Sequence, residues 1–169
     1  MARFTRTWPP PIVTRKNYGA FKSHVRYDFE RCCAYCYLHE NHFPRREDEF
    51  EIDHFCPQSE FKKVNILSND FRNPHNYYNL YWSCKVCNSS GNKSDKWPPP
   101  ELLEQGICFV DLCRDSWEHH YLLREDGFLV SLTPSAEWTI QSVNLNDENL
   151  IIFRAKLLKN GNSLDKSPD

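Results

Sequence analysis

Two short cysteine pairs constrain the fold of this chain more than any other feature of its sequence. Each pair has two residues between its cysteines, and 47 residues separate the first pair from the second. A pair spaced in this way turns the backbone around one ion, and two pairs supply the four soft ligands of a tetrahedral structural zinc site. The thiols that we predict to bind zinc are Cys33, Cys36, Cys84 and Cys87. The segment between the pairs is longer than a simple zinc ribbon needs, so it has room for an active site that the zinc ion stabilises.

The other four of the eight cysteines carry no spacing signal. No apolar stretch has the length of a signal-peptide core or of a membrane span, so we expect a cytoplasmic protein without a disulfide framework. We expect the remaining cysteines to be small buried hydrophobic side chains, namely Cys32, Cys56, Cys108 and Cys113. One alternative is a redox protein that uses Cys33 and Cys36 as a dithiol, and it predicts a reversible disulfide and no bound zinc.

The length of 169 residues, with 40% hydrophobic and 26% charged residues, is typical of one globular domain. We predict an α+β fold. Residues 1–31 are expected to form an arm and a helix, residues 32–97 the zinc core, and residues 98–169 a strand, hairpin and helix extension packed on that core. Trp8-Pro9-Pro10-Pro11 predicts an extended arm, and Trp97-Pro98-Pro99-Pro100 marks the end of the core.

Hydrophobic spacing predicts one helix and one strand in the first two segments. Apolar side chains recur at helical spacing over residues 15–30. Residues 49–55 are typical of a strand, which the following proline ends. We expect a loop-rich stretch over residues 58–76 with a short strand near residues 65–67, and a short helix after Cys87.

The C-terminal extension is predicted to contain a β-hairpin and two helices. The predicted strands lie at residues 107–113, 121–124 and 128–132. Asp126-Gly127 is a strong two-residue hairpin signal between the last two of these strands. Residues 135–143 are expected to be helical. The last helix is expected to begin at Asn146-Asp147-Glu148, where a capping residue precedes early acids, and to end at Asn160-Gly161.

Three residues in the core carry groups that suit phosphodiester hydrolysis. A neutral imidazole such as that of His54 is a general base near pH 7. The carboxylate of Asp53 and the side-chain carbonyl of Asn88 offer the oxygen ligands that Mg²⁺ prefers. A metal ion held there would stabilise charge on the phosphate while His54 activates water. Because neighbouring strand residues point to opposite faces, Asp53 and His54 serve one site only if the strand breaks up at that point.

The order of these motifs resembles that of the HNH endonuclease family. The chain carries Cys33-Ala34-Tyr35-Cys36, Asp53-His54-Phe55 with Pro57, Tyr78-Asn79-Leu80, and Cys84-Lys85-Val86-Cys87-Asn88. The resemblance implies a ββα-metal finger braced by a structural zinc ion on the four cysteines. It implies that His54 is the general base and that Asn79 orients it. It also implies that Asp53 and Asn88 bind the catalytic Mg²⁺ or Mn²⁺ ion.

Looser patterns over most of the chain look like one subgroup of that family, the PtuB-type HNH component of Septu anti-phage systems. These patterns add Thr139-Ile140, Leu145-Asn146 and Arg154 to the motifs above. The likeness implies an effector nuclease of bacterial anti-phage defence that works beside an ATPase of the ABC/SMC kind. Its implied substrate is nucleic acid, with DNA favoured and RNA as the alternative.

The final motif departs from the usual family pattern. A lysine commonly follows the last asparagine closely, whereas Ser89-Ser90-Gly91-Asn92 moves Lys93 further along this chain. Asn88 and Asn92 are therefore both candidates for the metal ligand, and we favour Asn88 because it adjoins a predicted zinc ligand. We expect Lys93 and Lys85 to contact the substrate.

The net charge of −2 argues against a protein that holds nucleic acid by bulk electrostatics. Binding would have to come from local basic residues or from a partner. The main alternative to an enzyme is a non-catalytic zinc module that binds nucleic acid or protein. It predicts that the cysteines are essential, whereas Asp53, His54 and Asn79 are dispensable.

Overall fold

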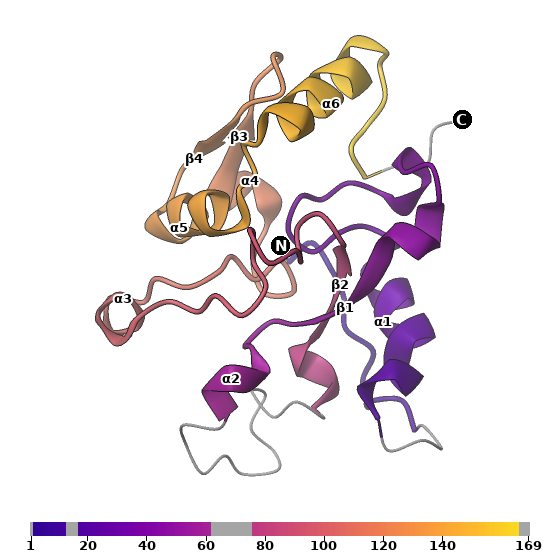
Figure 1. The fold of residues 1–169 in the computed structure, drawn as a ribbon, viewed down its shortest axis with the longest axis vertical. Coiled ribbons are helices and arrows are strands. Elements are labelled where there is room, and N and C mark those ends of the chain that lie inside the picture. The colour runs from indigo at the N-terminus through magenta and orange to yellow at the C-terminus, as the bar shows by residue number, and fades with distance from the viewer. Residues whose placement is uncertain (1, 13–16, 62–75, 166–169) are drawn as a thin grey trace.

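The computed structural model describes residues 2–12, 17–61 and 76–165, and it shows two small antiparallel sheets with helices around them (Figure 1). The α+β class predicted from the sequence is confirmed. The strands are β1 (Phe50–His54), β2 (Leu80–Cys84), β3 (Tyr121–Leu123) and β4 (Leu129–Ser131). The α-helices are α1 (Lys22–Asp28), α2 (Gln58–Phe61), α3 (Pro100–Glu104), α4 (Trp117–His120), α5 (Pro134–Val143) and α6 (Glu148–Lys159). Short 3₁₀ helices lie at Tyr18–Phe21, Glu40–His42, Arg46–Glu49 and Tyr77–Asn79. No helix in the described ranges is long and apolar enough to cross a bilayer.

The first sheet, β1 paired with β2, lies at the centre of the core. Its antiparallel register places Phe50 opposite Cys84 at one end and His54 opposite Leu80 at the other. Every residue of β2 is buried, and the rings of Phe50 and Trp82 stack with their centroids 5.6 Å apart. One end of the sheet therefore meets the second cysteine pair, and the opposite end carries His54.

Helix α1 lies within the span of residues 15–30 for which the sequence predicts a helix. It packs on β2, where the ring of the buried Phe29 lies 5.0 Å from that of Tyr81. Glu30 and Arg31 then adopt left-handed backbone conformations, with φ of 51° and 64°. This reversal ends the helix and leads the chain directly into the first cysteine pair.

The hairpin predicted at Asp126-Gly127 is confirmed as β3 and β4. Its loop has three residues rather than the expected two, since the Arg124 amide donates to the Phe128 carbonyl at 2.9 Å. The Gly127 amide closes the turn by donating to the Arg124 carbonyl, also at 2.9 Å. A left-handed glycine in the last loop position is the usual solution for hairpin loops of this length, and Gly127 has a φ of 84°.

Helices α5 and α6 confirm the two helices predicted in the extension, and their ends follow local rules. Thr133 caps α5 by accepting a hydrogen bond from the Ala136 amide, and Asn144 ends the helix with a φ of 58°. The Asn146 side chain then ties the helices to the hairpin. Its Oδ1 accepts from the Leu129 amide and its Nδ2 donates to the Leu129 carbonyl, both at 2.9 Å.

The strand predicted at residues 107–113 does not form. Its backbone groups are bonded elsewhere, because the Val110 amide donates to Thr139 Oγ1 of α5 at 2.9 Å. The short helices α2, α3 and α4 were not predicted, since none is longer than five residues. The strand expected near residues 65–67 lies outside the described residues.

The helix expected after Cys87 is also missing, and residues 85–95 form turns and bends instead. Short polar side chains compete there for the backbone hydrogen bonds that a helix needs. The side-chain Nδ2 of Asn92, for example, donates to the Val86 carbonyl at 2.7 Å. The two strands of the expected ββα arrangement are therefore present, but no helix follows them before α3.

Gly127→Ala is expected to destabilise the protein by roughly 3 kcal/mol or more. An added Cβ would lie 2.1 Å from the Ile151 carbonyl oxygen and 2.7 Å from the Ala155 nitrogen, both in the backbone of α6. Gly161→Ala is the matched control, because it has a similar φ of 71° but open space around it. Urea unfolding of the two variants measures the difference, and equal losses would contradict the close approach of the loop to α6.

Candidate metal centre and active-site pocket

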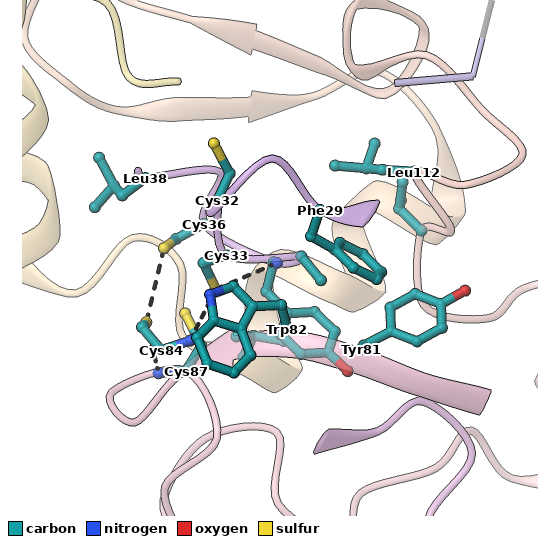
Figure 2. Close-up of a cluster of buried hydrophobic side chains, with 14 of the residues drawn as sticks. Phe29, Cys32, Cys33, Cys36, Leu38, Tyr81, Trp82, Cys84, Cys87 and Leu112 are labelled. Carbon is teal, nitrogen blue, oxygen red and sulfur yellow. Dashed lines mark hydrogen bonds between the residues drawn. The ribbon is translucent and has the colours of Figure 1, made fainter. Parts of the chain in front are cut away.

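The four predicted zinc ligands come together in the structure. The ligand atoms of Cys33, Cys36, Cys84 and Cys87 lie within 4.8 Å of one another, all four residues are buried, and Figure 2 shows them beside Trp82. The sulfurs of Cys36 and Cys84 are 3.8 Å apart. A tetrahedral site with Zn–S bonds of about 2.3 Å has sulfur–sulfur edges of about 3.8 Å. The cluster therefore has the ligand type and spacing to hold a metal ion such as zinc.

Backbone amides around the cluster donate hydrogen bonds to its sulfurs. The amides of Tyr35 and Cys84 donate to Cys33 Sγ at 3.5 and 3.4 Å, and the Cys87 amide donates to Cys84 Sγ at 3.5 Å. Burial opposes ionisation of Cys33, but hydrogen bonds from the other three thiols outweigh it and hold the Cys33 pKa well below its ordinary value. The same hydrogen bonds raise the pKa values of Cys84 and Cys87. A metal ion would replace these shared protons, because it binds thiolates.

The remaining cysteines lie outside this cluster. Cys32 and Cys56 are fully buried, as predicted, whereas Cys108 and Cys113 are only partly buried. In Figure 2 the Cys32 sulfur points away from the cluster, and it lies 3.6 Å from the Asp165 carbonyl. Within the described part of the chain, the four-cysteine cluster is the one group of three or more His, Cys, Asp or Glu side chains close enough to share a metal ion.

Three of the predicted active-site residues, Asp53, His54 and Asn88, line one pocket of about 370 Å³. The pocket is lined by Ile52, Asp53, His54, Pro57, Gln58, Ser59, Asn88, Ser94 and Asp95. Asp53 and His54 both border this pocket, although they are neighbours on β1 and both are still paired with β2. The strand ends directly after them, at His54, and does not break up between them.

Asn88 borders this pocket, whereas Asn92 is not among its lining residues. The side-chain amide of Asn88 donates to Glu51 Oε1 at 2.8 Å, which fixes its orientation at the edge of β1. The Asn92 side chain instead bonds to the carbonyl of Val86 and closes a turn. Of the two candidate ligands, Asn88 is the one that shares a pocket with Asp53.

Asp53 forms a buried ion pair with Lys93. The Lys93 ammonium lies 3.0 Å from Oδ2 and 3.3 Å from Oδ1, and the two side chains are 6% and 0% exposed. The Tyr35 hydroxyl donates to the same carboxylate. Burial raises the Asp53 pKa, while the Lys93 ammonium and the Tyr35 hydroxyl act in the opposite direction. Lys93 was predicted to contact substrate, but its amine is turned inward because it compensates the buried Asp53 charge.

The backbone after His54 is held by Asn79, the residue predicted to orient it. The Asn79 side chain accepts from the Cys56 amide at 2.8 Å and donates to the Cys56 carbonyl at 3.0 Å. Its backbone carbonyl accepts from the Phe55 amide at 2.9 Å. The Tyr18 ring lies edge-on to the imidazole, with centroids 4.8 Å apart. Asn79 thus acts on the strand end that carries His54.

Lys85 lies between the two cysteines of the second pair and is exposed, but it is not among the residues that line the pocket. Several other polar residues at the site were not predicted. Glu51 could have been found from the sequence, because it lies two residues before Asp53 and so on the same strand face. Tyr35 lies inside the first cysteine motif. Asp95 borders the pocket but follows a run of small polar residues that gives it no signal.

Asp53→Asn is expected to destabilise the protein by about 3 kcal/mol, because it leaves the Lys93 charge buried without its partner. Adding Lys93→Met to this variant is expected to restore part of the loss. The matched control is Asp126→Asn, whose ion pair with Arg124 is about half exposed and is worth less than about 1 kcal/mol. Urea unfolding of the zinc-loaded proteins tests this, and equal losses for both single variants would exclude a strong buried pair.

A larger hollow of about 580 Å³ lies between the N-terminal arm and the end of α1, away from these residues. Arg6 borders it, but its guanidinium is already bonded to Asp28 and to the carbonyls of Tyr77 and Leu80. This saturation makes the hollow a weaker candidate for a reactive site than the pocket at His54.

Neither a scan against protein-family models nor a search of curated proteins finds a match for this chain. The chemistry of the pocket therefore has to follow from its own residues.

Proposed function

We propose that the protein is a metal-dependent endonuclease of the HNH type that hydrolyses phosphodiester bonds. The observation that carries the proposal is the common pocket of Asp53, His54 and Asn88. It lies at one end of β1, and the other end of the β1–β2 sheet meets the cysteine cluster. The proposed general base and one oxygen ligand, Asp53, are thus held on β1, and the second ligand, Asn88, lies in the turn directly after Cys87 of the cluster.

His54 is the residue proposed to start the reaction. Its neutral imidazole takes a proton from a water molecule, whose oxygen attacks the phosphorus. The bond from phosphorus to the sugar 3′ oxygen breaks, and that oxygen leaves with a proton from solvent. The products are a 5′-phosphate and a 3′-hydroxyl, as the HNH resemblance implies. The edge of the Tyr18 ring and the side chain of Gln58 border the imidazole and limit its movement.

A divalent ion such as Mg²⁺ or Mn²⁺ is part of the proposal, and the donor set in the pocket suits it. The pocket offers the carboxylates of Asp53 and Asp95 and the amide of Asn88, which are hard ligands of the kind these ions bind. A carboxylate has about four acceptor positions, so the bonds from Tyr35 and Lys93 leave room at Asp53. Asp53 and Asn88 would hold the ion, which would neutralise charge on the phosphate.

The proposed substrate is nucleic acid, with DNA favoured and RNA as the alternative. The net charge of −2 gives no general attraction to a polyanion. The exposed Lys85 is the proposed local phosphate contact. We further propose that a partner delivers the substrate. The resemblance to the PtuB-type subgroup suggests that this partner is an ATPase of the ABC/SMC kind and that both proteins act in an anti-phage defence system.

The test is a cleavage assay with wild-type protein and His54→Ala on DNA and RNA, single-stranded and duplex. It is run with Mg²⁺ or Mn²⁺, and with a chelator too weak to remove the structural zinc. Cleavage by the wild type that needs both His54 and the divalent ion supports the proposal. Equal cleavage by both proteins contradicts the mechanism. If neither protein cuts, with or without the partner ATPase, a non-catalytic zinc module is the better description.

A further inference from the structure

Lys93 makes an unusual set of contacts for a lysine, because its side chain is completely buried. Its ammonium lies 2.6 Å from the His54 carbonyl oxygen, 3.0 Å from Asp53 Oδ2 and 3.3 Å from the Ser94 carbonyl oxygen. A lysine ammonium has three N–H donors, so these acceptors can use all of them. The rings of Tyr35 and Phe109 lie 6.0 and 5.8 Å from the charge and shield it from water.

The backbone of the same residue is attached to the cysteine cluster. The Lys93 amide donates to the carbonyl of Cys87 at 3.0 Å, and Cys87 is one of the four cluster ligands. Lys93 therefore joins the second cysteine pair to the end of β1 within one residue. Neither Lys85 nor Lys96 makes these contacts: Lys85 is exposed, and the Lys96 ammonium bonds to the carbonyls of Gly91 and Ser142.

We propose that Lys93 is a positioning residue that couples the metal cluster to His54 and Asp53. Its ammonium donates to the carbonyl of His54, while Asn79 accepts from the backbone amide of Cys56, so the backbone is held at two points, at His54 and two residues after it. It also fixes the Asp53 carboxylate together with Tyr35. This inference rests on the proposed function in so far as His54 is the general base, but the coupling itself is a property of the fold.

The first arm of the test measures catalysis in the full chain with Lys93→Ala, and with Lys159→Met as the exposed control. Misplacing a reacting group by about 1 Å costs roughly 10²-fold in rate. We expect Lys93→Ala to keep its zinc, to lower kcat by about 10²-fold and to leave KM within about twofold. Propylammonium, which can fill the vacated space, is expected to restore kcat at least about 10-fold, whereas tetramethylammonium, which has no N–H donor, is not.

The second arm needs no activity, so it separates failure of this inference from failure of the proposed function. The imidazole signals of His54 are followed by NMR in histidine-labelled protein and identified by their absence from His54→Ala. In Lys93→Ala we expect them to shift or broaden, while the signals of the exposed His119 stay in place. The same comparison is made with Lys93→Met, whose unbranched side chain keeps the volume filled.

Unchanged His54 signals in zinc-loaded Lys93 variants would overturn the coupling, whether or not the protein cuts nucleic acid. A normal kcat in Lys93→Ala would also overturn the coupling, and so would restoration of kcat by both propylammonium and tetramethylammonium. Loss of zinc and of the folded state in both Lys93→Ala and Lys93→Met would also overturn it, because Lys93 would then be needed for the core as a whole.

Discussion

Replacing Cys84 by serine, or stripping the metal from the wild type with a strong chelator, is expected to unfold the β1–β2 core. Structural zinc contributes about 10–16 kcal/mol of binding free energy in small zinc domains, whereas whole proteins are stable by about 5–15 kcal/mol. The cluster joins two segments 47 residues apart in the chain. Without the ion, four buried thiols remain at the place where these segments meet.

Zinc content and thermal unfolding by circular dichroism measure this effect. The wild type is expected to carry one zinc ion per chain, and Cys84→Ser none. Cys108→Ser is the matched control, because Cys108 is only partly buried and lies outside the cluster. A metal-free wild type that unfolds at the same temperature as the zinc-loaded protein would show that the ion does not brace the fold. A reversible disulfide between Cys33 and Cys36 in its place would favour the redox alternative.

His54→Ala is expected to lower kcat for phosphodiester cleavage by about 10³-fold, in the range that loss of a general base produces. The substitution removes the imidazole from the pocket but leaves the hydrogen bonds of the neighbouring backbone in place. These include the bond from the Phe55 amide to the Asn79 carbonyl. Zinc content and unfolding temperature are therefore expected to stay close to those of the wild type.

The control for this variant is His119→Ala, since His119 is an exposed histidine on α4. Single-turnover rates for the wild type and both variants give the comparison. Loss of cleavage in His54→Ala with zinc retained assigns His54 to chemistry rather than to the metal cluster. A loss of similar size in His119→Ala, or loss of zinc in His54→Ala, would remove that assignment.

The sequence was most informative where a residue type allows few environments. Two CxxC pairs predicted the metal cluster, and Asp126-Gly127 predicted a hairpin that the structure contains. Asn146-Asp147-Glu148 likewise marked the start of α6, although the residue that caps the helix is the first acid, Asp147. These are local signals, which depend on short-range geometry and do not need knowledge of the rest of the fold.

The structural features that could not be predicted from the sequence depend on contacts with residues distant in the chain. The sequence of residues 107–113 is typical of a strand, and a strand was predicted there. In the structure, however, the Val110 amide bonds to Thr139 and not to another strand. Lys93 was predicted to contact the substrate, because nothing near it in the sequence shows that it pairs with Asp53, forty residues earlier. Tertiary pairing of this kind overrides local preference.

The same long-range contacts decide the order in which the parts of the chain can fold during synthesis. Domains generally fold as their residues emerge from the ribosome. Here, however, the first cysteine pair cannot form the metal cluster until the second pair has been synthesised. The N-terminal arm cannot make its final contacts until even later residues have been synthesised. The backbone amide of Arg3 bonds to the Leu112 carbonyl, and its guanidinium bonds to Asp165. By contrast, β3 pairs with β4, β4 packs on α5, and Arg154 of α6 bonds to the carbonyl of Gly127 in the hairpin loop. These contacts span short sequence distances, and such contacts form quickly. The C-terminal unit can therefore assemble as soon as it is released, whereas the arm that contains Arg3, although it is made earlier, reaches its final contacts only after Asp165 has been made.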